Sequence, residues 1–151
     1  MTLKRVASEL ANLHRDPTET GLVAQISPDD TLHWVAYITG PQGSPYAQGV
    51  FDISITFEEH YPRGPPQITF TTPLFHPNVS DKGEIQLAEF DETQWSPAIT
   101  IRTLLISLQA MLSDPNPLES CILNKEAATL YLQDTAEFKK RARQWTEILA
   151  V

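Results

Sequence analysis

The only thiol in the chain belongs to Cys121. A single cysteine is either a nucleophile or a small apolar side chain, here directly ahead of Ile122 and Leu123, and the second use is the commoner one. One cysteine cannot form a disulfide within the chain. The four histidines are scattered and show no zinc-ligand spacing, so we expect neither a metal nor a cofactor.

Acid–base chemistry has one further candidate cluster, made of Asp52, Glu58, Glu59 and His60. Residues 51–57 alternate between apolar and polar side chains, which places Asp52 on the exposed face of a half-buried strand. The four side chains therefore form no credible metal or acid–base set.

The chain has 151 residues and a formal net charge of −8. This sign opposes binding to phosphates, so nucleic acid and anionic membranes are poor candidates as partners. Four cations cluster at residues 139–143, and we interpret them as the solvated face of a helix. Charged residues interrupt the apolar pattern of residues 1–15, which argues against a signal peptide or a membrane span. We expect a soluble protein of the cytosol, the nucleus or both.

The hydrophobic pattern predicts the order of the elements. Apolar residues at helical spacing indicate an opening helix over residues 3–13, with Pro17 just past its end. Strands are predicted at 22–26, 32–38, 51–57 and 67–71, and the irregular stretch at 72–97 is long enough to indicate a functional loop.

Three helices are predicted after this loop. Thr100 is the expected N-cap of the first, Asn124 of the second and either Asp134 or Thr135 of the third. The last helix should bury Phe138, Ala142, Trp145 and Leu149 on one stripe. Because strands and helices are segregated along the chain, the sequence predicts one α+β domain over residues 1–151 with a four-stranded antiparallel sheet.

Short motifs on these elements resemble those of the ubiquitin-conjugating enzyme family over essentially the whole chain. Any one of them is weak evidence, but here they occur together and in the family's order. They are Gly40-Pro41, Ser44-Pro45-Tyr46, Gly49-Val50-Phe51, Tyr61-Pro62, Pro65-Pro66, His76-Pro77-Asn78, Gly83-Glu84-Ile85, Trp95-Ser96-Pro97-Ala98, Asp114-Pro115-Asn116-Pro117, Glu126-Ala127-Ala128 and Tyr131.

The resemblance implies the family's fold and chemistry. Its members carry ubiquitin or a ubiquitin-like protein as a thioester on a cysteine and pass it to an amine, usually on a ligase. By this resemblance, Asn78 is either the amide that stabilises the oxyanion or the brace of the loop that shapes the site. His76 is expected to be structural, bonding to the loop backbone.

Gln86 stands where the resemblance places the catalytic cysteine. A primary amide has no ionisable proton near neutral pH and is not a useful acyl acceptor. Ala88 replaces a common acidic residue, and the stretch to Trp95 is longer than in the commonest members. These departures together indicate natural loss of the nucleophile more than one engineered change.

The resemblance also places residues 118–121 in a flap beside the catalytic position. Cys121 is the one candidate replacement nucleophile, and Glu119 corresponds to an acidic flap residue near the incoming lysine. Each has a plainer interpretation, a small apolar side chain for Cys121 and a solvated carboxylate for Glu119.

Partner contacts follow from the resemblance too. The family's groove for ligases and for the ubiquitin-activating enzyme is built from the first helix and two loops. Arg63 stands where many members expose a phenylalanine, which favours a RING-type ligase over a HECT-type one. The corresponding residues here are Lys4, Arg5, Arg63, Ser96, Pro97 and Ala98.

The sequence thus predicts a non-catalytic protein that binds or regulates a ligase or an active conjugating enzyme. Two alternatives stay open. One is a conjugating enzyme whose cysteine at position 86 was replaced or that uses Cys121; the other is a structural subunit that does not contact ubiquitin.

Overall fold

The computed structural model describes residues 2–15, 22–90 and 93–151. Pro17 and residues 91–92 of the long loop, on which the sequence analysis drew, lie outside these residues. The elements are α1 (Thr2–Arg15), β1 (Leu22–Ser27), β2 (Asp30–Thr39), β3 (Val50–Thr56), β4 (Gln67–Phe70), α2 (Ile101–Ser113), α3 (Lys125–Gln133) and α4 (Thr135–Leu149), with the short 3₁₀ helices η1 (Ala88–Phe90) and η2 (Glu119–Cys121).

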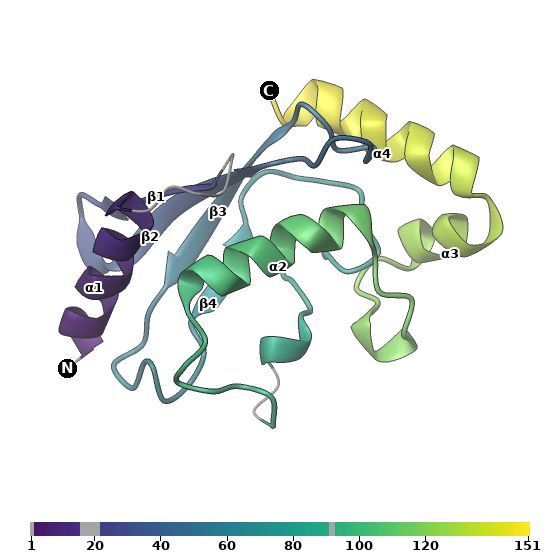
Figure 1. Cartoon of the computed structure of the whole chain (residues 1–151). Coiled ribbons are helices and arrows are strands. Elements are labelled where there is room, and N and C mark those ends of the chain that lie inside the picture. The colour runs from purple at the N-terminus through teal and green to yellow at the C-terminus, as the bar shows by residue number, and fades with distance from the viewer. Residues whose placement is uncertain (1, 16–21, 91–92) are drawn as a thin grey trace.

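The four strands form one antiparallel sheet in the order β1-β2-β3-β4. Figure 1 shows α1 beside one end of this sheet, α2 lying across it, and α3 with α4 at the opposite end. The predicted α+β architecture of an opening helix, a four-stranded sheet, a long loop and three further helices is confirmed. The two 3₁₀ helices were not predicted.

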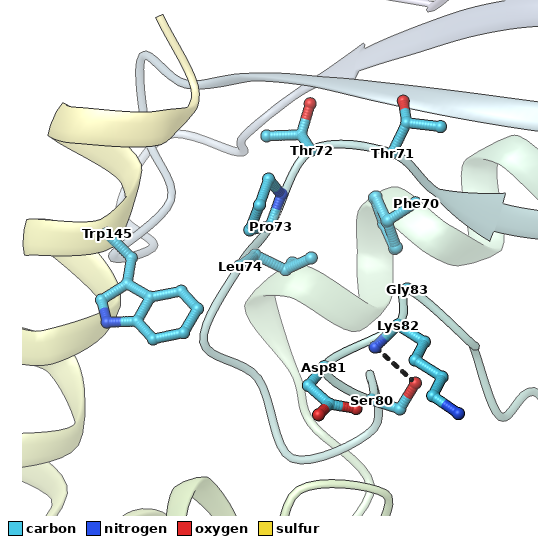
Figure 2. Close-up of a pocket in the computed structure, with 10 residues that line it drawn as sticks. All are labelled: Phe70, Thr71, Thr72, Pro73, Leu74, Ser80, Asp81, Lys82, Gly83 and Trp145. Carbon is cyan, nitrogen blue, oxygen red and sulfur yellow. Dashed lines mark hydrogen bonds between the residues drawn. The ribbon is translucent and has the colours of Figure 1, made fainter.

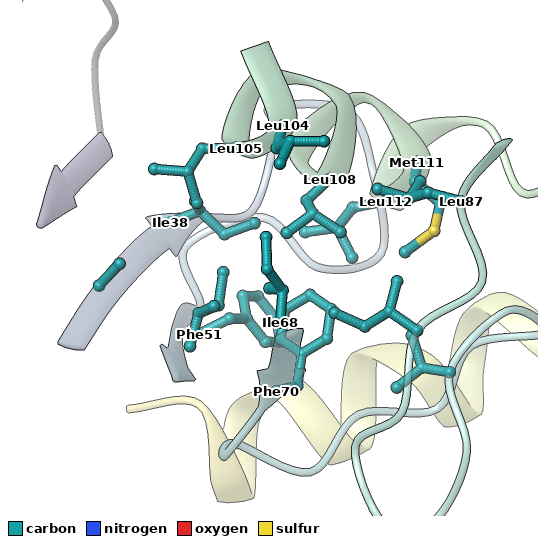
Figure 3. Packing of buried hydrophobic residues seen from close by; sticks show 14 of the residues in the cluster. Ile38, Phe51, Ile68, Phe70, Leu87, Leu104, Leu105, Leu108, Met111 and Leu112 are labelled. Carbon is teal, nitrogen blue, oxygen red and sulfur yellow. The ribbon is translucent and has the colours of Figure 1, made fainter. Parts of the chain in front are cut away.

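The core lies between α2 and the inner face of the sheet (Figure 3). Leu104, Leu105 and Leu108 of α2 are fully buried against β2–β4 side chains such as Ile38 and Phe51. The alternation predicted for β3 is present, because Phe51, Ile53 and Ile55 are buried while Asp52 is exposed. Burial of one aliphatic side chain stabilises the folded state by about 1.5–3 kcal/mol. Because α2 buries a whole apolar face in this way, its packing on the sheet is a major source of stability.

Side-chain caps start the last three helices. The Thr100 side chain accepts the N–H of Thr103, that of Asn124 accepts the N–H of Ala127, and that of Asp134 accepts the N–H of Glu137. The predicted caps at 100 and 124 are confirmed. Of the two candidates for α4, Asp134 is the cap.

The predicted buried stripe of α4 is partly wrong. Phe138 and Ala142 are buried as expected, but Trp145 is 39% exposed and Leu149 is 43% exposed. The third buried position is Thr146, whose hydroxyl donates to the Ala142 carbonyl at 2.8 Å. Because this bond satisfies the hydroxyl, Thr146 can be buried. The apolar pattern instead predicts burial of its neighbour Trp145 and of Leu149.

Candidate functional site

The site loop is set against β4 by a tight turn at residues 80–83. The Ser80 N–H donates to the Glu84 carbonyl at 2.9 Å, and the Ser80 hydroxyl oxygen accepts the Glu84 N–H at 3.0 Å. Gly83 has a φ of +86°, and a Cβ at this residue would lie 2.0 Å from the Phe70 carbonyl oxygen. Only glycine fits this close approach to β4. Gly83 therefore determines the position of residues 84–86, which follow the turn.

Gln86 follows this turn, directly after Ile85, which forms an isolated antiparallel β-bridge with Val79. Ile85 and Leu87 on either side of it are buried, whereas Gln86 is only partly buried. Its N–H donates to the Asn78 carbonyl at 3.2 Å. The side chain at position 86 is therefore more accessible than those of its two neighbours, and its residue lies beside the loop that carries Asn78.

His76 is fully buried and joins this loop to α2. The N–H of Asn78 donates to Nδ1 of His76 at 3.0 Å, so the ring proton resides on Nε2, which donates to the Met111 carbonyl at 2.8 Å. Burial lowers the pKa of His76 to about 4, with the bond to Met111 acting in the opposite direction. The imidazole is neutral at pH 7, and its bonds go to backbone groups.

Asn78 is also fully buried and joins the loop to the flap. Its Nδ2 donates to two carbonyls, that of Asn116 at 2.9 Å and that of Cys121 at 2.8 Å. Its Oδ1 accepts the Asn116 N–H at 2.8 Å. Both amide hydrogens therefore bind backbone carbonyls, one just ahead of the flap and one at its end, which is the geometry of a brace.

Asn116, which the sequence analysis gave only as part of the Asp114-Pro115-Asn116-Pro117 motif, is the partner of this brace. Its own side chain lies 3.6 Å from the Cys121 sulfur and accepts the Leu118 N–H at 3.0 Å. Cys121 is partly buried at the end of η2, while Glu119 at the start of η2 is exposed. The structure thus brings Asn78 and Cys121 together and leaves the Glu119 carboxylate in solvent.

A pocket of about 210 Å³ lies behind the 80–83 turn (Figure 2). Trp145 of α4 forms one wall, Pro73 and Leu74 stand opposite the turn, and the dashed line marks the bond from the Lys82 N–H to Ser80. The lining residues are Phe70, Thr71, Thr72, Pro73, Leu74, Ser80, Asp81, Lys82, Gly83 and Trp145.

Among the described residues, no group of three or more histidine, cysteine or acidic side chains is placed to hold a metal ion. None of the described helices is long and apolar enough to cross a membrane.

A family model of ubiquitin-conjugating enzymes matches residues 5–146. The chain belongs to the ubiquitin-conjugating enzyme family. Among solved structures, it is similar to the E2 domain of a Toxoplasma gondii ubiquitin conjugating enzyme, with 38% sequence identity, a TM-score of 0.88 and coverage of 98% of each chain. Its architecture is therefore the ubiquitin-conjugating fold, and the chain is an E2-like protein of the ubiquitin pathway.

In this ubiquitin-conjugating fold, three segments predicted to bind ligases lie side by side. The Thr2 hydroxyl donates to the Tyr61 carbonyl at 2.9 Å, which ties α1 to the loop ahead of residues 62–64. The Trp95 indole donates to the Pro62 carbonyl at 2.9 Å and ties that loop to residues 96–98. Trp95 thus joins two parts of the surface, a role that sequence reasoning did not assign to it.

Most of the predicted ligase-binding residues are accessible. Lys4, Arg63, Pro97 and Ala98 are exposed, and Ser96 is half-buried. The Ser96 hydroxyl accepts the Ala98 N–H at 3.2 Å, which fixes the bend of this loop. We call these five residues, together with Arg5, the partner surface.

Arg5 differs from the other residues of the partner surface, because most of its donors point inward. Its guanidinium donates to the carbonyls of Pro97 at 2.7 Å and Ile99 at 3.3 Å, and to Glu9 through Nε at 3.0 Å. Burial acts to lower the pKa of Arg5, but the hydrogen bond and the charge of Glu9 outweigh it and raise that pKa. Arg5 therefore connects α1 to the 97–99 segment as a permanent cation.

Glu9 is the residue that the sequence analysis missed. It is one of the charged residues that interrupt the apolar pattern of residues 1–15, yet it is only 6% exposed. One carboxylate oxygen accepts from Arg5 and from the Tyr61 hydroxyl, and the other accepts the Ile101 N–H at 2.7 Å. The pKa of Tyr61 is raised, first by burial and then by its bond to Glu9. A signal was present, since Glu9 falls on the same helical stripe as Val6 and Leu13.

Proposed function

We propose that this chain is a non-catalytic member of the ubiquitin-conjugating family that works as a binding protein. A ubiquitin-conjugating fold implies contact with ubiquitin and with ligases in general. The proposed role is narrower: the chain contacts a RING-type ligase through the partner surface and regulates that ligase or an active conjugating enzyme.

The observation that carries this proposal is the side chain at position 86. Gln86 occupies the partly exposed position next to the Asn78 loop, where the family resemblance places the catalytic cysteine. An amide cannot form the thioester on which ubiquitin is carried, because it has no thiolate or comparable nucleophile. The described residues around it nonetheless form a braced loop and a flap, as a folded binding protein requires.

The bonds of Asn78 support the same proposal. An oxyanion donor needs an N–H directed at the reacting carbonyl. Both Nδ2 hydrogens of Asn78 already bind the carbonyls of Asn116 and Cys121. Retention of this asparagine is therefore explained by its structural role, without requiring catalysis.

The character of the partner surface favours a RING-type partner. Arg63 is exposed and replaces the aromatic anchor that many family members present. Pro97 and Ala98 are also exposed and give the partner surface a small apolar area for a partner to contact. Loss of a buried aromatic hot spot typically costs 2 kcal/mol or more in affinity, so a ligase that needs this anchor is disfavoured.

A titration of the ¹⁵N-labelled chain with ubiquitin and with a panel of RING domains tests the proposal. At least one RING domain should shift resonances of α1 and of residues 62–64 and 96–98. Ala98→Arg, which places a long cation in the contact, should abolish these shifts. Gln133→Arg, at the exposed end of α3 on the opposite side of the molecule, is the matched control and should leave them intact. If neither ubiquitin nor any RING domain moves a resonance, the structural-subunit alternative is favoured instead.

One observation favours a second function, that of an enzyme using Cys121. The Cys121 carbonyl is held by Asn78, so its residue is attached to the loop that precedes position 86. Ubiquitin-activating enzyme, ATP and ubiquitin would then produce a thiol-sensitive adduct on the unaltered chain, and Cys121→Ser would remove it. An adduct that survives Cys121→Ser, or no adduct at all, excludes this second function.

A further inference from the structure

The partner surface is anchored by one buried carboxylate. Glu9 is the common acceptor for Arg5 on its own helix, for the Tyr61 hydroxyl on the loop after β3, and for the first N–H of α2 at Ile101. These donors come from three separate segments of the chain. A buried carboxylate is stable only when charge and hydrogen bonds compensate it, and here all three donors do so.

The effect of Glu9 reaches the surface through Arg5. With Nε held by Glu9, the other end of the guanidinium spans the carbonyls of Pro97 and Ile99. The same guanidinium lies 5.8 Å from the ring centroid of Tyr61. The segment that presents Pro97 and Ala98 to solvent is therefore attached to α1 by a cation whose own position depends on Glu9.

We propose that Glu9 is a positioning residue for the partner surface: it fixes Arg5 and thereby holds residues 97–99 in the shape that the partner meets. This inference rests on the proposed function for the identity of the partner. Glu9 itself is buried and touches no partner. Its contribution is to have the contact loop ordered before binding, which avoids an ordering cost at the moment of association.

Two isosteric variants separate positioning from stability. Glu9→Gln has only one amide oxygen, and we expect it to stay with the buried Ile101 N–H, because the partly exposed Arg5 can bind water instead. The NH₂ group then faces the Arg5 Nε–H, donor against donor, and Arg5 is released. Tyr61→Phe removes only the hydroxyl donor and keeps the ring under Arg5. Both variants lose a buried hydrogen bond and should be less stable, but only the first should disturb the partner surface.

The removal of one negative charge needs its own control. Glu59 lies on the loop that joins β3 and β4, it is exposed, and its backbone carbonyl accepts the Thr2 hydroxyl. Glu59→Gln removes the same formal charge close to α1 without touching Arg5. Any general electrostatic effect on partner binding should therefore appear equally in Glu59→Gln.

The test has two readouts, taken at a temperature at which every variant is fully folded. The first is NMR of the free chain, following hydrogen exchange of the Arg5 Nε–H and the backbone order of residues 96–98. The second is calorimetric affinity for a RING domain that binds the wild-type chain. We expect Glu9→Gln to accelerate the exchange and to weaken binding on the order of tenfold. Tyr61→Phe and Glu59→Gln should stay within about twofold of wild type in affinity.

Unchanged affinity and unchanged Arg5 exchange in Glu9→Gln, alongside a lowered melting temperature, would overturn the proposal and leave Glu9 a purely structural residue. If the wild-type chain binds no RING domain, the proposed function fails instead. The NMR comparison then still decides the positioning role: a protected Arg5 Nε–H in Glu9→Gln overturns it, and a deprotected one supports it.

Discussion

Asn78 uses every hydrogen-bonding group of its side-chain amide inside the protein. Replacing it with alanine leaves the carbonyls of Asn116 and Cys121 and the N–H of Asn116 without these partners, each in a part-buried setting. We expect Asn78→Ala to lower the free energy of unfolding by about 2–3 kcal/mol, measured by denaturant titration. Asn12→Ala, at an exposed asparagine of α1, is the control and should change it by less than about 0.5 kcal/mol. A loss for Asn78→Ala as small as the control's would contradict the brace.

His76 predicts how stability changes with pH. Its pKa is about 4 in the folded chain, below the ordinary value of 6.5, so between these values the unfolded chain binds the proton and the folded chain does not. Stability must therefore fall as the pH falls through this window, by about 3 kcal/mol for this group. Carboxylates contribute to the same slope, so the comparison is with His76→Gln. Unfolding free energies of both chains at pH 7 and pH 4 should show a smaller decrease for the variant, and equal decreases would count against a buried neutral imidazole.

The predictability of single side chains from sequence depended on whether their partners are local. Asn124 and Asp134 cap helices that follow them directly, and their type and position suffice to indicate this. Apart from the Arg5–Glu9 pair within α1, Asn78 and Glu9 bind groups 38 to 92 residues away along the chain, so no local pattern reveals those partners. A family resemblance singled out Asn78, but Glu9 could only be suspected from its place on an apolar stripe.

The loop that carries position 86 depends on the turn at residues 80–83. Gly83 has positive φ, and an added Cβ would collide with the Phe70 carbonyl; Gly43 has a similar φ of +84° but open space around it. Gly43→Ala should therefore cost only the backbone strain, about 1–2 kcal/mol. Gly83→Ala should cost more than this, because the turn must also move away from β4. Thermal unfolding of the two variants compares them directly, and equal losses would show that the close approach to Phe70 is unimportant.

Among helices and strands, existence and order were predictable while packing was only partly so. The apolar pattern indicates α2 and β3 correctly because both bury a complete face against the core. It misplaces the buried face of α4, since Thr146 is buried through its bond to Ala142 and Trp145 instead lies at the edge of a pocket. The 3₁₀ helices η1 and η2 are too short to produce a periodic signal.

For the domain as a whole, the account rests on one contrast. The ubiquitin-conjugating fold, the braced site loop and the partner surface are all present, and position 86 holds an amide where the family resemblance expects a thiol. The order of the motifs predicted the fold, because most of them occupy the turns and loops between its helices and strands. We expect the side chain at position 86 to decide whether ubiquitin is carried, and the fold alone does not reveal that side chain.

Intact-mass analysis of the chain and of Gln86→Cys, each incubated with ubiquitin-activating enzyme, ATP and ubiquitin, tests this contrast most directly. The account predicts no adduct on the unaltered chain and a thiol-sensitive adduct, one ubiquitin in mass, on Gln86→Cys. Such a result would show a scaffold that lacks only its nucleophile. A thiol-sensitive adduct on the unaltered chain would contradict the account.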